Sequence, residues 1–132
     1  YEKKMSCLFV SLAKVHPAQT EDNLRILICD FLATNPVLLD GKRADEIIHM
    51  STGQALEPYV THMRKKSTWG GAIEIRAYTI LAKANVRVRV LKTRKNIDFV
   101  HDPSNPLSTI TWDGGHYEPL LNGALKKLPT PQ

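Results

Sequence analysis

Apolar residues recur at intervals of three and four through the first two-thirds of the chain, which is the spacing of an amphipathic helix. This spacing predicts helices over five ranges: 7–15, 21–34, about 42–50, 53–64 and 72–84. Thr20 caps the second helix and Asn35-Pro36 ends it. Pro58 predicts a break or kink in the fourth, because proline lacks the N–H that a helix interior requires. The apolar stripe of the fifth helix comprises four residues: Ile73, Ala77, Ile80 and Leu81.

From residue 86 the apolar period changes to two, which is typical of strands. Val86, Val88 and Val90 alternate with more polar residues, so this strand is expected to have one exposed face. Further strands are predicted over three ranges: 97–100, 107–112 and 116–121. Asp113-Gly114-Gly115 is a tight hairpin signal between the last two. Helices first and strands last predict an α+β fold, with a helical N-terminal part packed on a small, mostly antiparallel sheet of C-terminal strands.

Length and composition favour one globular domain over residues 1–132, with 42% hydrophobic residues and no apolar run of the roughly 18 residues that a membrane span needs. The chain begins at Tyr1 without a secretory signal. Together with the proline-rich segment 128–132, expected to be a loose tail, this start suggests a piece excised from a longer polyprotein. Two cysteines make no disulfide framework, and we expect a cytoplasmic monomer with reduced thiols.

The net charge of +5 is unevenly distributed. Six basic residues follow one another with no acid between them: Lys83, Arg87, Arg89, Lys92, Arg94 and Lys95. Such a cluster forms either one solvated face of a hairpin or a surface that binds RNA or another acidic partner. The solvated face is the simpler interpretation, so nucleic acid is not the expected partner.

Two residues far apart in the sequence are candidates for thiol chemistry. Cys7 begins an apolar helix, where the helix dipole favours the thiolate and free N–H groups can form an oxyanion hole. His116 would supply the base, and the two can meet only through the fold. Glu118, two residues further along a strand, points to the same face and could orient the imidazole. The simpler alternative for Cys7 is a packing role.

The remaining residues of interest are the second cysteine, possible metal ligands, the glycine loop and Glu74. Cys29 lies in an apolar helical segment and is predicted to be a buried hydrophobe. No Cys-x-x-Cys or closely spaced histidine pair predicts a metal site, and no cofactor is expected. Trp69-Gly70-Gly71 combines an aromatic residue with two residues that let backbone approach a ligand closely. Glu74, near the start of the following helix, is expected to have a structural role.

Three motifs together resemble those of the ovarian-tumour (OTU) family of cysteine proteases, which are deubiquitinases with a papain-like fold. They are Cys7-Leu8-Phe9, the segment from Trp69-Gly70-Gly71 through Glu74 to Ala77, and His116-Tyr117-Glu118. They stand in the order that the family has. The resemblance covers residues 4–121, and the middle motif is its most specific part.

The resemblance implies a role for each motif. Cys7 would be the nucleophile and His116 the general base, and Glu118 would stand where the family has Asn or Asp. Asp113 or Asn122 are alternatives for that third residue, or the site is a dyad. The oxyanion loop would comprise Lys4, Met5 and Ser6, with Lys4-Met5 replacing the family's Asp-Gly. The substrate channel for the Gly-Gly tail of ubiquitin would be bordered by five residues: Trp69, Gly70, Gly71, Trp112 and Tyr117.

The resemblance predicts a thiol-dependent deubiquitinase that hydrolyses the bond after the C-terminal Gly-Gly of ubiquitin or a ubiquitin-like modifier. The small size and the departures from the family pattern resemble divergent viral members, so cleavage of a viral polyprotein is a second expected activity. The alternative is a catalytically weak OTU-like module that binds ubiquitin or another protein. An RNA-associated domain that uses the basic cluster is the third hypothesis.

Overall fold

Five helices and six strands make up residues 7–15 and 19–120, the residues that the computed structural model describes. The helices are α1 (Cys7–Val15), α2 (Glu21–Ala33), α3 (Ala44–Thr52), α4 (Leu56–Met63) and α5 (Ala72–Ala82). The strands are β1 (Val37–Leu39), β2 (Lys42–Arg43), β3 (Asn85–Val90), β4 (Lys95–Phe99), β5 (Leu107–Trp112) and β6 (Tyr117–Pro119). This arrangement confirms the predicted α+β class.

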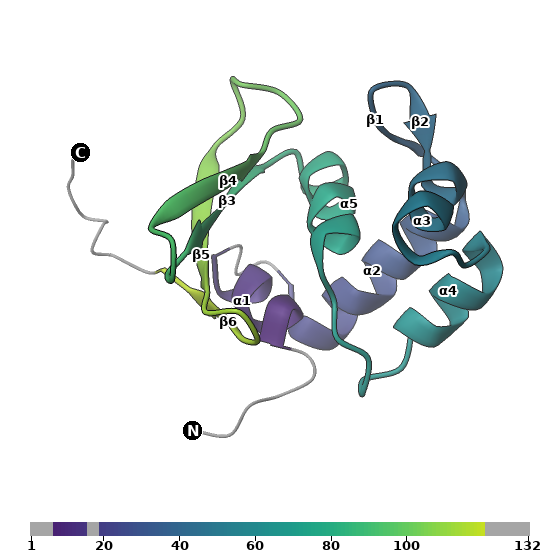
Figure 1. Ribbon diagram of the computed structural model, residues 1–132, viewed down its shortest axis with the longest axis horizontal. Coiled ribbons are helices and arrows are strands. Elements are labelled where there is room, and N and C mark those ends of the chain that lie inside the picture. Colours follow the sequence, from purple (N-terminus) through teal and green to yellow (C-terminus); the bar gives the residue numbers. More distant parts are fainter. Residues whose placement is uncertain (1–6, 16–18, 121–132) are drawn as a thin grey trace.

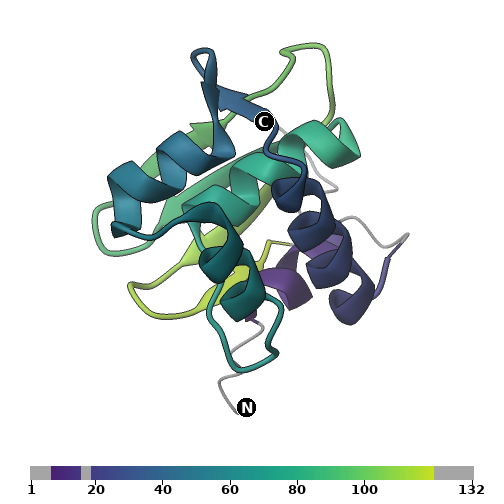
Figure 2. The same ribbon diagram turned by 90° about the vertical axis from the view of Figure 1, so that its right-hand side faces the viewer.

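The main sheet has the strand order β4-β3-β5-β6. β3 pairs antiparallel with β4 and parallel with β5, while β5 and β6 form an antiparallel hairpin. Helix α5 lies centrally, with the sheet on one side and α3 and α4 on the other (Figure 1). The view turned by 90° puts α3 and α4 in front and the sheet behind (Figure 2). Helix α1 packs against β5 and β6, so the first described helix meets the last strand.

Asn85 binds the loop between β4 and β5. Through this loop the chain crosses from one edge of β3 to the other. Its side-chain amide donates to the carbonyl oxygens of Asp102 (2.9 Å) and Asn105 (3.1 Å). Its side-chain oxygen accepts from the N–H of His101 at 3.0 Å. One buried amide therefore supplies partners for three backbone groups of a loop that has no strand of its own.

Several predicted boundaries are confirmed. Helix α1 spans residues 7–15 and β5 spans 107–112, as the sequence predicts. The Thr20 side chain accepts from the N–H of Asn23 at 3.2 Å, which is the predicted cap of α2. The predicted cap at Ser6 lies outside the described residues.

The segment around residues 37–64 departs from the prediction. Lys42–Arg43 is a strand rather than helix, and it pairs with β1 across Asp40-Gly41, whose φ angles are 51° and 75°. Gly53 ends α3 with φ 75° instead of starting α4. The kink predicted at Pro58 is wrong, because Pro58 lies in the first turn of α4, where no backbone N–H has an intrahelical acceptor.

Helix α5 buries the predicted stripe only in part: Ala77 is fully buried, and Ile73 and Ile80 are half-buried and pack against the core. Its most buried side chains include Glu74, Ile75 and Tyr78, whereas Leu81 is 38% exposed. The helix contacts α2 and β1 as well as β3 and β4. Because neighbours cover it from several directions, polar and apolar residues are buried together, and apolar spacing alone does not mark the inner face.

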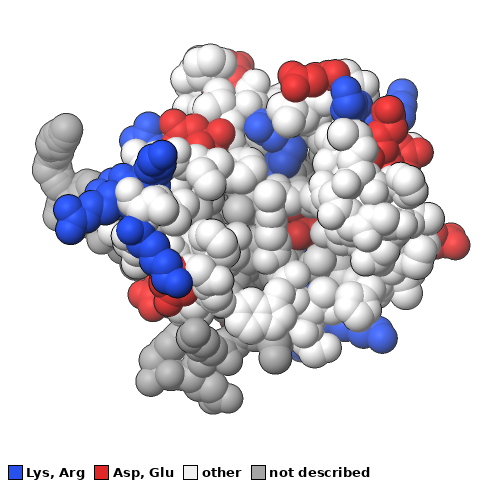
Figure 3. All heavy atoms as spheres, in the orientation of Figure 1, with Lys and Arg blue, Asp and Glu red and all other residues white. Residues whose placement is uncertain are grey.

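The basic cluster lies mostly on the β3–β4 hairpin, and Lys and Arg side chains gather at the sheet edge of the face in Figure 3. Arg87 is paired with Asp98 of β4, at 2.8 Å between Nε and Oδ1. Since this pair uses one of the central arginines, the hairpin supports the solvated-face interpretation better than RNA binding. Within residues 7–15 and 19–120, no helix is both long and apolar enough to cross a membrane.

Candidate active site

Cys7 is the first residue of α1 and is 2% exposed. Its sulfur accepts a hydrogen bond from the backbone N–H of Tyr117 in β6, at 3.4 Å. Its carbonyl oxygen accepts from the Ser11 hydroxyl at 2.8 Å. The thiol thus sits at the positive end of the α1 dipole and touches the strand that follows His116.

The β5–β6 turn holds His116, the residue before Tyr117, in a fixed backbone position. The Asp113 carboxylate accepts from the N–H groups of Gly115 (3.0 Å) and His116 (2.8 Å), and the Asp113 N–H donates to the His116 carbonyl at 3.2 Å. The His116 residue is 5% exposed. Asp113 therefore fixes the backbone of His116.

Glu118 approaches the imidazole of His116, with 3.3 Å between Oε2 and Nε2. At this separation the two groups attract as an ion pair once the ring is protonated. The Glu118 side chain is 62% exposed, so solvent screens the attraction. The longer side chain of glutamate nevertheless reaches the ring.

Two aromatic residues stack on the β5–β6 hairpin, and one of them, Tyr117, contacts the thiol through its backbone N–H. The rings of Trp112 and Tyr117 stack with their centroids 6.1 Å apart and an interplanar angle of 27°. Burial, with the neighbouring Cys7 and Glu74 adding smaller effects, raises the pKa of Tyr117 to about 12. The Tyr117 hydroxyl is therefore neutral at physiological pH.

The loop Trp69-Gly70-Gly71 rests on the first turn of α1. A Cβ at Gly70 would lie 2.8 Å from Leu8 Cδ2 and 3.0 Å from Phe9 Cε2, so only glycine fits there without a shift. A Cβ at Gly71 would meet nothing within 4 Å. Trp69 is 42% exposed. The loop thus packs closely beside the residues that follow Cys7, while Gly71 faces open space.

The buried carboxyl of Glu74 lies beneath this loop. Its Oε1 accepts from the Gly71 N–H at 2.7 Å and its Oε2 accepts from the Tyr59 hydroxyl at 2.6 Å. Burial raises the pKa of Glu74, although both hydrogen bonds oppose this shift. Burial and the neighbouring Glu74 charge raise the pKa of Tyr59 as well. The expected structural role of Glu74 is confirmed by these contacts.

Sequence reasoning missed Tyr59 and Arg25, which complete the surroundings of Glu74. The Arg25 guanidinium lies 4.2 Å above the Phe9 ring and donates to the Met63 carbonyl at 2.8 Å. Burial lowers the pKa of Arg25, an effect opposed by acids that include Glu74. The sequence signal for a buried Arg25 was its place among apolar residues in α2. Helical spacing alone assigns a charged residue at such a position to the surface.

Other candidate residues fall away from this site. Cys29 is fully buried in α2, and burial raises the pKa of its thiol to about 11, so it is the inert cysteine. The predicted oxyanion-loop residues Lys4, Met5 and Ser6 lie outside the described residues, as does Asn122. Among the described residues there is no group of three or more potential metal ligands.

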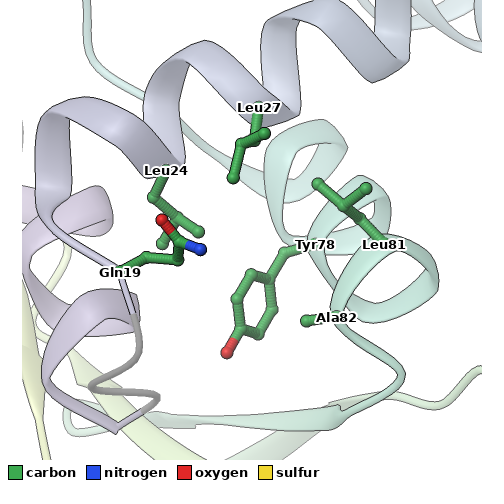
Figure 4. A pocket seen from close by; sticks show the side chains of 6 residues that line it. All are labelled: Gln19, Leu24, Leu27, Tyr78, Leu81 and Ala82. Atoms are coloured by element: carbon green, nitrogen blue, oxygen red, sulfur yellow. The ribbon is translucent and has the colours of Figure 1, made fainter.

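Two hollows lie near α5. A groove of about 400 Å³ runs along the glycine loop, with walls from the ends of α3 and α4, among them Gln54, Tyr59 and His62. A second pocket of about 280 Å³ lies between α2 and α5 and is lined by Gln19, Leu24, Leu27, Tyr78, Leu81 and Ala82 (Figure 4). Apolar groups dominate the second pocket, which contains neither the thiol nor the imidazole.

The chain is similar to several known proteins. It is 31% identical over 122 residues to the ubiquitin thioesterase OTU1 of Mus musculus. The aligned region covers 87% of this chain and 33% of the mouse protein. It therefore spans about a third of the length of that relative. No family model matches the chain.

Solved structures share the fold. An OTU domain in complex with ubiquitin superimposes with a TM-score of 0.75 at 23% identity, covering 90% of this chain and 65% of that one. The Hazara virus OTU bound to ubiquitin gives a TM-score of 0.67 at 14% identity, covering 87% and 74%. These likenesses confirm the predicted papain-like arrangement of helices on a small sheet.

Proposed function

We infer that the chain, which belongs to the ovarian-tumour (OTU) family, is a cysteine-dependent deubiquitinase that hydrolyses the bond after the C-terminal Gly-Gly of ubiquitin or a ubiquitin-like modifier. The observation that carries this proposal is the 3.4 Å contact between the Cys7 sulfur and the Tyr117 N–H. It supports the proposal because a thiol at a helix start lies directly beside β6, the strand that His116 precedes and that contains Glu118. A thiol, an imidazole and a carboxylate near one another are the groups that covalent acyl transfer uses.

The first step forms a thioester. Cys7 gives its proton to His116, and the sulfur attacks the carbonyl carbon of the terminal glycine. The electron pair of the C=O bond moves to oxygen, where N–H groups at the start of α1 stabilise the negative charge. The nitrogen–carbon bond to the substrate lysine then breaks, and His116 donates its proton to the departing amine.

The second step releases the modifier. His116 takes a proton from water, and the hydroxide oxygen attacks the thioester carbon. The C–S bond then breaks, its electron pair stays on sulfur, and His116 returns its proton to the Cys7 thiolate; the carboxylic acid released loses its proton to water. Because Nε2 of His116 lies 3.3 Å from Glu118 Oε2, we assign the proton transfers of both steps to Nδ1. Glu118 would stabilise the imidazolium during each transfer.

The glycine loop and the aromatic pair would determine which chains enter. In the proposal, Trp69, Gly70 and Gly71 would form one wall, and Trp112 and Tyr117, whose rings stack on each other, would form the other. A channel between a backbone wall and flat rings accommodates glycine residues, whereas a side chain on the substrate would need space that a close backbone does not leave. This matches the Gly-Gly tail that the proposed activity requires.

The two cysteines provide a matched experiment. Release of a fluorophore from the C-terminus of ubiquitin is measured for the wild type, Cys7→Ala and Cys29→Ala. We expect turnover by the wild type and Cys29→Ala and none by Cys7→Ala. Absence of turnover by the wild type, or equal turnover by the wild type and Cys7→Ala, contradicts the proposal.

A ubiquitin probe with a thiol-reactive C-terminus separates the enzyme from the alternative binding module. An active site forms a covalent adduct that maps to Cys7 and persists in Cys29→Ala. A module without activity binds ubiquitin but yields no adduct at either cysteine.

A further inference from the structure

Glu74 is a buried acid whose two oxygens bind two different segments. The residue is 1% exposed and lies in the first turn of α5. Oε1 accepts from the backbone N–H of Gly71 at 2.7 Å, and Oε2 accepts from the hydroxyl of Tyr59 in α4 at 2.6 Å. A single carboxyl group therefore links α4, α5 and the glycine loop.

The glycine loop is held at two points. Gly70 packs closely against the side chains of Leu8 and Phe9 in α1, the two residues that follow Cys7. Gly71, whose Cβ position is open, is held instead through its N–H by Glu74. The first contact determines how close the loop lies to α1, while the second fixes the position of the half-buried backbone at Gly71.

Stability alone is a weak reason for an acid at this position. Burying a carboxyl group costs free energy, and replacing a buried ionic group by apolar residues is often neutral or stabilising. The neighbouring Arg25 and the two hydrogen bonds offset part of that cost. The specific result of the arrangement is a fixed backbone amide at Gly71, in the loop that packs on α1 through Gly70, and apolar packing cannot supply it.

We propose that Glu74 is a positioning residue for the substrate channel, with Tyr59 as the partner that orients its carboxyl, so that the Gly71 backbone stays where only a glycine tail can pass. This inference rests on the proposed deubiquitinase function. Neither side chain takes part in bond cleavage: both act through the loop, by limiting which residue fits beside it.

The test uses Tyr59→Phe, Glu74→Gln and Glu74→Ala, with Tyr78→Phe as a control for the loss of a buried tyrosine hydroxyl away from the loop. kcat and KM are measured on ubiquitin reporters with the natural tail and with alanine in place of the penultimate glycine. We expect Tyr59→Phe to reduce the preference for glycine about tenfold, which is the effect of one hydrogen bond to a charged group. The change should lie mainly in KM.

The other variants define the cause. Glu74→Gln keeps an oxygen for the Gly71 N–H and an N–H for the Tyr59 oxygen, so we expect its preference to stay within about twofold of the wild type. Tyr78→Phe should also retain the wild-type preference. Glu74→Ala should lose the preference most, and Tyr59→Phe decides the question if Glu74→Ala does not fold.

Hydrogen exchange at the Gly71 amide gives a readout that does not need turnover. It should be slow in the wild type and Tyr78→Phe, and faster in Tyr59→Phe. If the wild type does not cleave ubiquitin, the proposed function fails, and the exchange rates still decide whether Glu74 and Tyr59 hold the loop. Folded Tyr59→Phe with wild-type exchange at Gly71 and wild-type preference for glycine would overturn the inference.

Discussion

Alanine at Gly70 and alanine at Gly71 should have opposite consequences, although the residues are neighbours. At Gly70 the new methyl group would lie 2.8 Å from Leu8 Cδ2, inside a core where Leu8 and Phe9 are almost fully buried. Forcing an extra carbon into such packing costs about 1–3 kcal/mol. For a domain of this size we expect Tm to fall by about 3–12 °C.

At Gly71 the methyl group would meet nothing within 4 Å, so we expect stability to change by no more than about 0.5 kcal/mol. If this residue borders the channel, the same methyl group obstructs the substrate tail. One misplaced methyl group changes kcat/KM by roughly 10- to 200-fold in a fitted pocket. Gly71→Ala should therefore be a stable protein with strongly reduced turnover.

The assay pairs thermal unfolding with fluorophore release from ubiquitin for both variants and the wild type. Wild-type kcat/KM in folded Gly71→Ala would refute the channel assignment. An unchanged Tm in Gly70→Ala would refute the packing of the loop on α1. The two results are independent, because only the first requires a substrate.

Three further predictions concern other parts of the structure. Glu118 is largely exposed and lies 3.3 Å from His116, so Glu118→Ala should lower kcat by less than about tenfold. His116→Ala should abolish turnover. An equal loss of kcat in both variants would contradict this and would establish a triad that depends fully on Glu118. Asn85→Ala removes three hydrogen bonds to the β4–β5 connection and should cost about 2–4 kcal/mol in urea unfolding, and a loss below about 1 kcal/mol would contradict that account. Hydrogen bonds from Arg87 hold the pKa of Asp98 below its usual range, so the pair stabilises the fold above the unfolded pKa of about 3.9 and ceases to do so as pH falls through the lower folded value. Because both side chains are more than a third exposed, we expect less than about 1 kcal/mol, and Asp98→Asn should remove this part of the pH profile of stability between about pH 4 and pH 2; an identical profile in the variant would contradict the assignment.

Local patterns predicted the parts of the fold that local physics decides. Helix α1 and strand β5 have the predicted bounds, because one is a continuous apolar helical run and the other lies between two turn signals. The β1–β2 hairpin carried a readable signal too, since Asp40-Gly41 is a turn pair between short extended segments. The error at Pro58 came from placing the start of α4 three residues early.

Three-dimensional neighbours decided the rest. Cys7 and His116 were recognisable as candidates, but no spacing rule shows that α1 meets β6. The buried Glu74 and Arg25 violate the rule that charges lie outside, and only their partners explain them. The predicted viral origin and the second activity on a polyprotein stay predictions, because both an animal protein and a viral OTU are similar to this chain.

The meeting of α1 with β6 has a consequence for the timing of activity. The proposed nucleophile Cys7 lies on the first described helix and the proposed base His116 precedes the last described strand, so the proposed catalysis requires closure of nearly the whole described chain into one loop. Strand β6 has only three residues and lies at the sheet edge. Local opening of such an edge requires less free energy than global unfolding. Turnover should therefore stop before the helices melt on heating, and during synthesis it should begin only after residues 116–118 have folded onto α1.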